Sequence, residues 1–181
     1  MPQPNDIDRL LEQAWAYRRE GNFKAARDLV ENAHKLCKDT DFEYIARIFH
    51  IYAQFESDLE NYPSALELNQ KSLSFYEQID NPDKKSHSMR HIADIHRRLG
   101  NYGESEKSYQ QALTIFREYS RARQSDLANM LRGLALVSEN LGKTAQAIEA
   151  WQEAQSIYQQ LGLQNGVDEA AKKIAQLKPL L

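Results

Sequence analysis

The chain has 181 residues, of which 41% are hydrophobic and 27% charged, and its formal net charge is -3. This length fits one domain, 1–181, that can bury enough apolar surface to fold without disulfides or structural metal ions. A net negative charge gives no overall basic field, so we expect binding neither to nucleic acid nor to an anionic membrane surface. The single cysteine, Cys37, excludes an intramolecular disulfide and fits a reducing compartment, for which the cytoplasm is the default.

Strands and membrane spans are equally unsupported by the sequence. Only 7 glycines and 5 prolines are present, too few to separate many short strands, and this composition favours long helices. The first residues, 1–6, contain neither a basic nor an apolar segment, and no later stretch approaches the roughly 18 apolar residues of a membrane helix. Neither export nor membrane insertion is expected.

Helix start and stop signals divide the chain into successive helix pairs. The predicted pairs are 6–20 with 23–37, 41–59 with 63–79, 82–99 with 103–119, and 122–141 with 145–161. They define four repeat units, approximately 6–38, 41–80, 82–120 and 121–162. A ninth helix over 167–178 places Val167, Ala171, Ile174 and Leu177 on one face, with Lys172, Lys173 and Gln176 turned away from it, and we expect it to cap the last pair.

Four similar turns mark the repeat, and their first residues are 39, 40 and 42 positions apart. They are Gly21-Asn22-Phe23, Glu60-Asn61-Tyr62, Gly100-Asn101-Tyr102 and Gly142-Lys143-Thr144. The glycines can adopt the left-handed conformation that ends a helix, and the asparagines are expected to cap the next one. Between the pairs, Thr40 and Glu43 have the spacing of a capping box, and Asn81 precedes a proline suited to a first helical position.

Small residues recur at three fixed distances from these turns: seven before, five after and twelve after. The twelve positions are Ala14, Ala53, Ala93, Ala135, Ala26, Ala65, Ser105, Ala147, Ala33, Ser72, Ala112 and Ala154. Exclusive use of alanine and serine indicates that two helix backbones approach closely at each of these positions.

This pattern of turns and small residues resembles the tetratricopeptide repeat (TPR) family. The resemblance implies an all-α fold, a right-handed superhelical array of four TPR-like helical hairpins plus a C-terminal capping helix. The period near 40 is longer than the usual 34 and is similar to the repeats of kinesin light chains and of bacterial peptide-sensing regulators. HEAT-type repeats have a comparable length, but the Gly-Asn-Tyr turn favours the tetratricopeptide interpretation.

In this family the first helix of each hairpin lines a concave binding face. The resemblance therefore suggests a peptide-binding set made of Trp15, Arg18, Arg19, Arg47, His50, Gln54, His87, Arg90, Asp94, Arg97, Asn129 and Arg132. Leu11 and Glu139 are expected on the same face. With Asp8, Asp58 and Arg98, which are expected on the same face, these first-helix positions carry seven arginines and four carboxylates in a protein of negative net charge.

Two interpretations of the arginines remain open. Their guanidinium groups could bind carboxylates or phosphates of an acidic peptide, with Trp15 as an apolar anchor. Alternatively, they are solvated or paired with Asp58, Asp94 and Glu139, and then contribute little.

No catalytic or metal site is predicted. His87 and His91 have the spacing that lets two imidazoles share a metal ion, but Arg90, Arg97 and Arg98 would repel a cation, which favours a structural or solvated role. Cys37 has only His34 near it in sequence as a base, so buried packing is the expected role. We expect no cofactor.

The function predicted from sequence is a non-enzymatic scaffold or adaptor that binds a peptide segment of another protein. One alternative is a ligand- or peptide-responsive regulatory module. Another is self-assembly, in which the partner is a second copy of the chain and the protein is a homo-oligomer.

Overall fold

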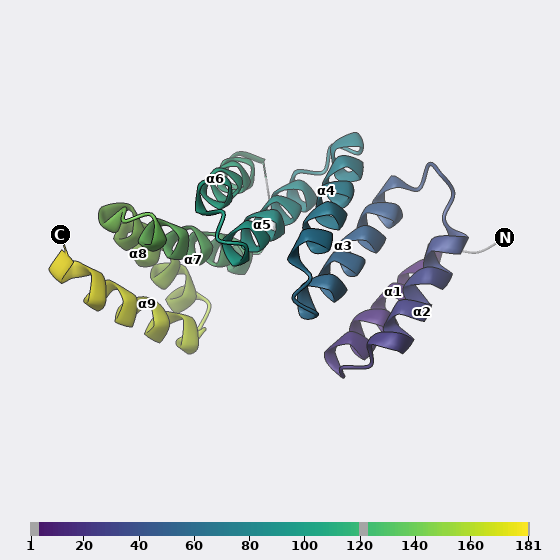
Figure 1. Cartoon of the computed structure of the whole chain (residues 1–181), viewed down its shortest axis with the longest axis horizontal. Coiled ribbons are helices and arrows are strands. Elements are labelled where there is room, and N and C mark those ends of the chain that lie inside the picture. The colour runs from purple at the N-terminus through teal and green to yellow at the C-terminus, as the bar shows by residue number, and fades with distance from the viewer. Residues whose placement is uncertain (1–3, 120–122, 181) are drawn as a thin grey trace. The chain divides into compact units, whose positions relative to one another are not determined.

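The computed structural model describes residues 4–119 and 123–180, and these residues form nine α-helices, one short 3-10 turn and no strand (Figure 1). The helices are α1 Pro4–Arg19, α2 Phe23–Leu36, α3 Phe42–Asp58, α4 Tyr62–Gln78, α5 Pro82–Arg98, α6 Tyr102–Tyr119, α7 Gln124–Asn140, α8 Thr144–Gln160 and α9 Gln164–Leu177, followed by the turn Lys178–Leu180. The predicted all-helical fold of paired helices is confirmed.

Most helix boundaries lie within two residues of the predicted ones, and the exception is the last helix. It begins at Gln164 rather than at 167, because Gly162 has a positive φ of 69° and ends α8 with a tight turn that the sequence reading did not include. The predicted start of the seventh helix at 122 lies outside the described residues.

The turns within the hairpins share one geometry. Gly21, Gly100 and Gly142 have φ values of 77°, 76° and 70°, and Glu60 takes the same left-handed region at 57°. In each turn two backbone N–H groups donate to carbonyls of the preceding helix, as in Asn61 to Glu56 at 2.8 Å and Glu60 to Ser57 at 3.1 Å. These bonds form a Schellman motif and satisfy carbonyl groups that would otherwise lack partners.

The predicted helix caps are only partly confirmed. Asn22 accepts a hydrogen bond from the Ala25 amide at 3.3 Å, as expected. The Asn61 prediction is wrong, because its side-chain amide donates to Glu56 at 2.8 Å and makes no cap bond. The capping box at Thr40 is also wrong: Asp41 occupies the N-cap position of α3 but makes no side-chain cap bond, and its carboxylate accepts from the Lys38 amide at 2.8 Å.

All twelve predicted small positions are 0% exposed, which confirms that they lie where helices approach most closely. The two serines among these positions, both on second helices, have an added role. Ser72 donates to the Ala46 carbonyl at 2.8 Å, and Ser105 donates to the Ala93 carbonyl at 2.7 Å. Each serine therefore packs like alanine and also ties the second helix of its hairpin to the first.

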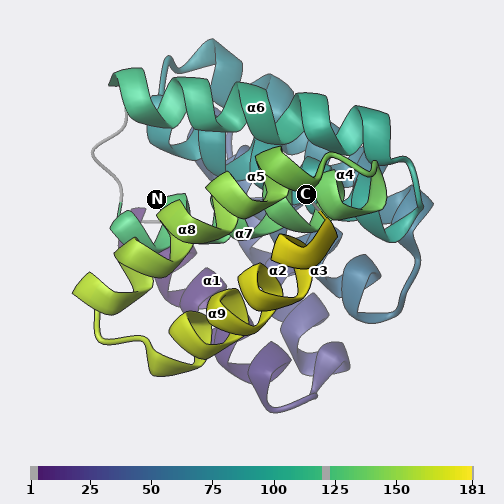
Figure 2. The ribbon, with the colours of Figure 1, turned by 90° about the vertical axis from the view of Figure 1, so that its left-hand side faces the viewer.

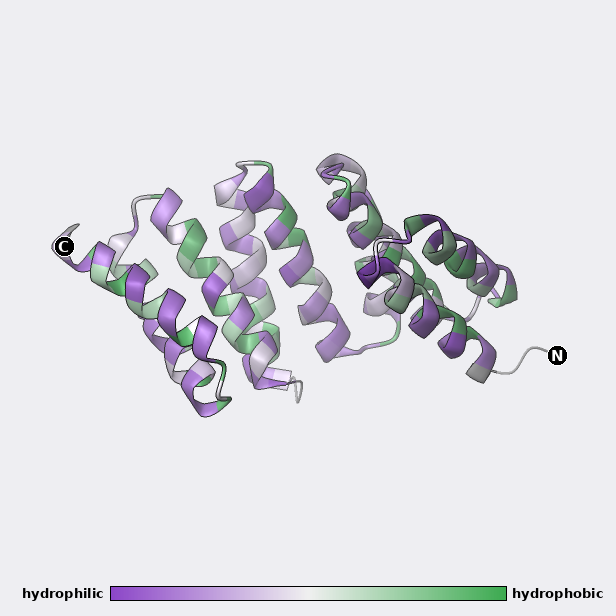
Figure 3. Cartoon of the chain, turned by 90° about the horizontal axis from the view of Figure 1, so that it is seen from below, coloured by the Kyte–Doolittle hydropathy of each residue, from purple (hydrophilic) through white to green (hydrophobic). Residues whose placement is uncertain are grey.

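The chain divides into two compact units, Met1–Asn81 and Pro82–Leu181. The first unit holds α1 to α4, with a core built on Leu11, Val30 and Phe55. Figure 3 shows both hydrophobic and hydrophilic residues along its helices, the amphipathic pattern that lets one side of each helix pack. The single-domain assignment over 1–181 stays a prediction.

The second unit holds α5 to α9 and has two core clusters. One is centred on Tyr109 and Phe116 of α6 with residues of α7 and α8. In the other, Ile174 and Leu177 of α9 pack with Trp151 of α8, and Figure 2 shows α9 lying beside α8. The ninth helix therefore covers apolar surface of the last hairpin.

Candidate functional site

In the first unit, two ion pairs join the first helices of the two hairpins, α1 and α3. Arg18 of α1 donates from Nε and Nη2 to the two oxygens of Asp58 on α3, at 2.6 and 2.8 Å. Arg47 of α3 donates to Asp8 of α1. The guanidinium of Arg47 holds the pKa of Asp8 below its ordinary value. The ion pairs thus connect α1 and α3 in both directions.

Aromatic contacts accompany these ion pairs. The Arg18 guanidinium carbon lies 5.0 Å from the centre of the Trp15 ring, and the Trp15 and His50 rings are 6.2 Å apart. His50 Nδ1 is 3.1 Å from Asn69 Oδ1 on α4, and Gln54 Oε1 is 3.5 Å from Arg18 Nη2. Trp15, Arg18, His50 and Gln54 therefore lie in one neighbourhood.

In the second unit, two arginines share one carboxylate. Asp94 Oδ2 accepts from Arg90 at 3.3 Å, and Asp94 Oδ1 lies 3.8 Å from Arg97. The hydroxyl of Tyr109, from α6, also donates to Asp94 Oδ1. The Nε atoms of Arg90 and Arg97 are buried and have no hydrogen-bond partner among the described residues. This group on α5 carries one more positive than negative charge.

Arg132 of α7 is neutralised from the last helix. It donates from Nε and Nη2 to the two oxygens of Glu169, both at 2.7 Å. Hydrogen bonding to Glu169 raises the pKa of Arg132, and the same contact lowers the pKa of Glu169. Asn129 accepts from the Tyr158 hydroxyl at 3.0 Å. Both predicted residues of α7 are thus held by α8 or α9.

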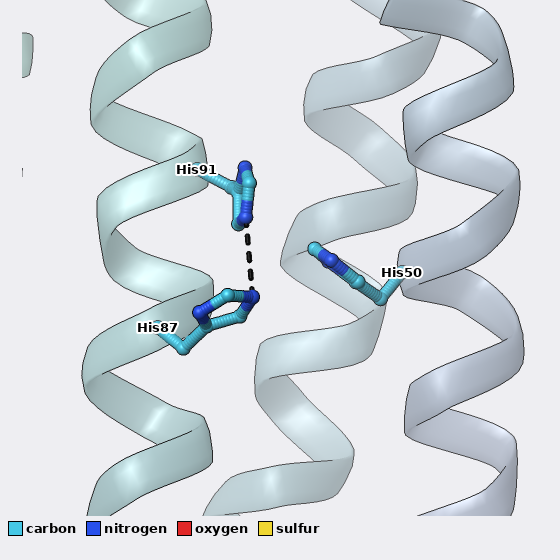
Figure 4. Close-up of side chains that lie close together, drawn as sticks. All are labelled: His50, His87 and His91. Atoms are coloured by element: carbon cyan, nitrogen blue, oxygen red, sulfur yellow. Dashed lines mark hydrogen bonds between the residues drawn. The ribbon is translucent and has the colours of Figure 1, made fainter. Parts of the chain in front are cut away.

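His87 and His91 lie on successive turns of α5, and their rings form a T-shaped pair (Figure 4). Their Nε2 atoms are 3.2 Å apart, and Arg90 Nη2 lies 2.8 Å from His91 Nε2. The pair is therefore part of the same charged surface of α5 as the shared carboxylate.

Three sequence-based placements need correction. Leu11, expected on the binding face, is 0% exposed and lies in the core, because Ile7, Leu11 and Ala14 form the apolar side of α1. Glu139 was expected to pair with arginine, but it accepts from Trp151 Nε1 and from Lys173 Nζ, both at 2.7 Å. Lys173 was assigned to the outward side of the last helix, yet it reaches α7.

Four partners that hold first-helix residues were not predicted from the sequence. Glu169 completes the Arg132 pair, while Tyr109, Trp151 and Tyr158 donate hydrogen bonds to residues of first helices. A signal existed for two of them. Tyr109 and Trp151 stand nine residues after their turns, and the same position holds Asn69, which contacts His50.

The arrangement offers charge and hydrogen bonds rather than an activated nucleophile. Burial raises the pKa of the Cys37 thiol, and its sulfur donates to the Ala33 carbonyl at 3.4 Å, which disfavours the reactive thiolate. Two open hollows lie away from the predicted face. One of about 300 Å³ is lined mainly by α2, and one of about 320 Å³ mainly by α6. Within the described residues, no helix is long and apolar enough to cross a membrane.

Comparison with known proteins identifies the repeat. The family model described as Tetratricopeptide repeat matches residues 44–118, and no curated protein sequence matches the chain. Among solved structures, aspartyl phosphate phosphatase F from Bacillus subtilis superposes with a TM-score of 0.85 at 16% identity, over 98% of this chain and 46% of that one. The chain thus spans less than half the length of that phosphatase.

Two further structures share the fold. The apo form of RapI gives a TM-score of 0.84 at 16% identity, over 94% of this chain and 62% of that one. A putative kinesin light chain with nearly identical TPR-like repeats, from Podosopora anserina, gives 0.69 at 17% identity, over 98% and 97%. The resemblance to the tetratricopeptide repeat family, and to its long-period members, is confirmed.

Proposed function

We propose that this protein is a non-catalytic scaffold that binds an acidic segment of another protein. The tetratricopeptide repeat fold and the family match over 44–118 support this proposal. The binding surface proposed for the second unit is the first-helix face of Arg90, Asp94, Arg97, Asn129 and Arg132. In the first unit it is the face of Trp15, Arg18, Arg19, Arg47, His50 and Gln54. Each unit presents its own surface.

One observation carries the proposal: Arg90 and Arg97 share the single carboxylate of Asp94. An arginine with its own carboxylate has little to gain from a ligand, because its charge-assisted hydrogen bonds are already made. Two arginines on one carboxylate leave guanidinium donors and one positive charge available. A carboxylate or phosphate of a peptide would complete both sets of bonds.

The first unit supports a different contribution to binding. Since Arg18 and Arg47 are matched by Asp58 and Asp8, an acidic ligand would have to displace an existing ion pair there. The exposed part of Trp15, with Arg18 stacked over its ring, offers apolar area instead. We therefore assign charge recognition to the second unit and apolar contact to the first.

The test compares partner capture by the wild-type chain and by the double variant Arg90→Glu/Arg97→Glu, followed by affinity measurement in increasing salt. We expect the variant to lose the partner and the wild-type affinity to fall with salt, since the screening length drops from about 10 Å at 0.1 M to about 3 Å at 1 M. A partner bound equally well by both proteins, and independently of salt, would refute the proposal.

The matched control is Arg117→Glu/Lys143→Glu, which reverses two charges in the same unit away from the first-helix face. Arg117 pairs with Glu153, and Lys143 pairs with Glu106. This variant has the same net charge as the first one, so it separates a local effect from a change in overall charge. It should keep the partner.

The second candidate is a regulatory module that responds to a small peptide or other ligand. The better superposition on phosphatase F and RapI than on the kinesin light chain favours it, and in those two proteins the matched region is only part of a longer chain. Native mass spectrometry of the purified protein separates the candidates. A co-purifying small peptide supports the regulatory module, whereas a captured protein supports the scaffold.

A further inference from the structure

We propose that His87 and His91 form a binding site for a divalent transition-metal ion, Cu²⁺, Ni²⁺ or Zn²⁺, on the surface of α5. The inference goes beyond the scaffold function and does not depend on it. It rests on the geometry of two side chains within one helix.

The distance between the two imidazoles fits a shared ion. Their Nε2 atoms are 3.2 Å apart and their ring centres 4.6 Å apart (Figure 4). Two nitrogen ligands at about 2.0 to 2.1 Å from a metal, with an angle between square-planar and tetrahedral, are separated by about 2.9 to 3.4 Å. Because the histidines are four residues apart on one helix, the backbone of α5 places both side chains on the same side and within reach of one ion.

The hydrogen-bonding pattern around His91 Nε2 also indicates a metal site. A guanidinium can only donate, so the 2.8 Å contact from Arg90 Nη2 means that His91 Nε2 presents its lone pair. If His87 Nε2 carries a hydrogen, it competes with Arg90 for that lone pair. If it does not, two lone pairs face each other at 3.2 Å. A metal ion between the two nitrogens relieves either arrangement, with the hydrogen of each ring on Nδ1.

The nearby charges set the strength of the site. Arg90 and Arg97 oppose a cation, whereas the carboxylate of Asp94, one turn further along α5, favours it. Arg90 has a long side chain and already contacts Asp94 at 3.3 Å, so it can leave His91 without losing its ion pair. Removing the Arg90 charge should therefore tighten metal binding.

Imidazole nitrogen suits Cu²⁺, Ni²⁺ and Zn²⁺, with Cu²⁺ bound most tightly. Two protein ligands leave coordination positions for water or for a group of a bound partner.

The experiment is calorimetric titration of the full-length, tag-free chain with CuCl₂, NiCl₂ and ZnCl₂. We expect one ion per chain, with the highest affinity for Cu²⁺. His87→Ala and His91→Ala should each abolish this binding. His34→Ala is the matched control, because this histidine is exposed on α2 and its ring contacts Phe49, and it should leave binding unchanged. Arg90→Gln should raise the affinity.

A second measurement needs no variant. In long-range ¹H–¹⁵N spectra of the imidazole rings, added Zn²⁺ should shift the Nε2 signals of two of the five histidines and leave His34 unchanged. Ion binding that survives both histidine substitutions, that disappears in His34→Ala, or that shifts rings other than those of His87 and His91 would overturn the proposal.

Discussion

The two units place arginines on the same helices of the repeat but neutralise them differently. In the first unit, Arg18 and Arg47 each meet a carboxylate of the neighbouring first helix. In the second unit, Arg90 and Arg97 divide one carboxylate between them, and Arg132 is matched only from α9. Arginines on first helices thus form cross-links in one unit and leave unmatched positive charge in the other.

The units also differ in how neighbouring hairpins are joined. In the second unit, tyrosine rings fill notches left by glycines: Tyr109 lies against Gly133 of α7, and Tyr158 lies against Gly166 of α9. In the first unit, ion pairs join α1 to α3, and the Phe49 and Phe75 rings stack at 5.8 Å within the second hairpin. Packing in the second unit should therefore tolerate less change in volume.

Deletion of α9 should have the largest effect on stability, because this helix covers apolar surface of the second unit. Deleting residues 164–181 removes the buried Ile174 and Leu177 and exposes Trp151. Burial of a large apolar side chain is worth about 1.5 to 3 kcal/mol, so the deletion should cost about 5 kcal/mol. Chemical denaturation of the full and shortened chains measures this cost, and equal midpoints would show that α9 does not cap the unit.

Overpacking at a helix crossing should come next. Ala93 is 0% exposed, and its carbonyl accepts from Ser105 of α6 at 2.7 Å. Ala93→Leu should destabilise the protein by about 3 kcal/mol, because the added carbon atoms would separate α5 from α6. A neutral result in thermal unfolding would show that the assigned repeat register does not describe the packing of α5.

The glycine notch gives a prediction with an internal control. A Cβ atom on Gly133 would collide with the Tyr109 ring, which is itself 0% exposed and cannot move away easily. Gly133→Ala should therefore cost about 2 kcal/mol. Gly103, in the first turn of α6, has nothing within 4 Å of a Cβ atom, so Gly103→Ala should stabilise by about 0.5 kcal/mol. If both variants melt alike, the notch does not constrain the unit.

These packing features show what the sequence could predict and what it could not. The twelve small positions were visible because close backbone approach recurs with the repeat and leaves only alanine or serine. Gly133 gave no such signal, since a single glycine inside a helix has many explanations and its partner, Tyr109, is 24 residues away in the chain. Only the three-dimensional arrangement brings the ring to the notch.

The proposed binding face also contains residues that the sequence could predict and residues that it could not. The repeat register identified Arg18, Arg90 and Arg132 as first-helix residues. Asp58 and Asp94 could be named as possible arginine partners because they stand on first helices themselves. Glu169 could not, because it lies on the last helix, 37 residues from Arg132. Leu11 could have been placed correctly, since its spacing from Ile7 and Ala14 is that of a buried helix side.

The cross-link in the first unit predicts a dependence on acid. The bond from Arg47 keeps the pKa of Asp8 lower in the folded than in the unfolded chain, so its stabilising effect is present above the ordinary aspartate pKa of about 3.9 and disappears as the pH falls through the folded value. In Arg47→Gln, the pKa of Asp8 should rise. The Tyr44 hydroxyl, which donates to Asp8 at 3.0 Å, should limit the rise.

Carboxyl NMR titration of both proteins measures the shift. Arg132→Gln is the corresponding variant of the second unit, where the pKa of Glu169 should rise because the bond from Arg132 holds it down. Since partly exposed ion pairs contribute only about 0 to 1 kcal/mol, the melting temperature near neutral pH should change little in either variant. An unshifted Asp8 titration in Arg47→Gln would mean that the cross-link is absent in solution.

The smallest expected effect on stability concerns the turns within the hairpins. The first unit has a strained backbone at one of these turns, where the second unit has glycine. Glu60 has a φ of 57° in the position that Gly100 occupies at 76°, and both turns make the same pair of backbone hydrogen bonds. The left-handed conformation costs a residue with a Cβ atom about 1 to 2 kcal/mol, whereas glycine loses about 0.4 to 1 kcal/mol more chain entropy on folding. Glu60→Gly should therefore stabilise the protein by about 0.5 kcal/mol, and Gly100→Glu should destabilise it by a similar amount.

Because the side chain of Glu60 is exposed, its removal takes away little packing, and the two substitutions isolate the contribution of the backbone conformation to the free energy of unfolding. Denaturation midpoints of both variants measure it. A higher midpoint for Glu60→Gly together with a lower one for Gly100→Glu would show that the two turns follow the same backbone rule. A lower midpoint for Glu60→Gly would instead show that this glutamate makes an interaction that outweighs the strain of its backbone.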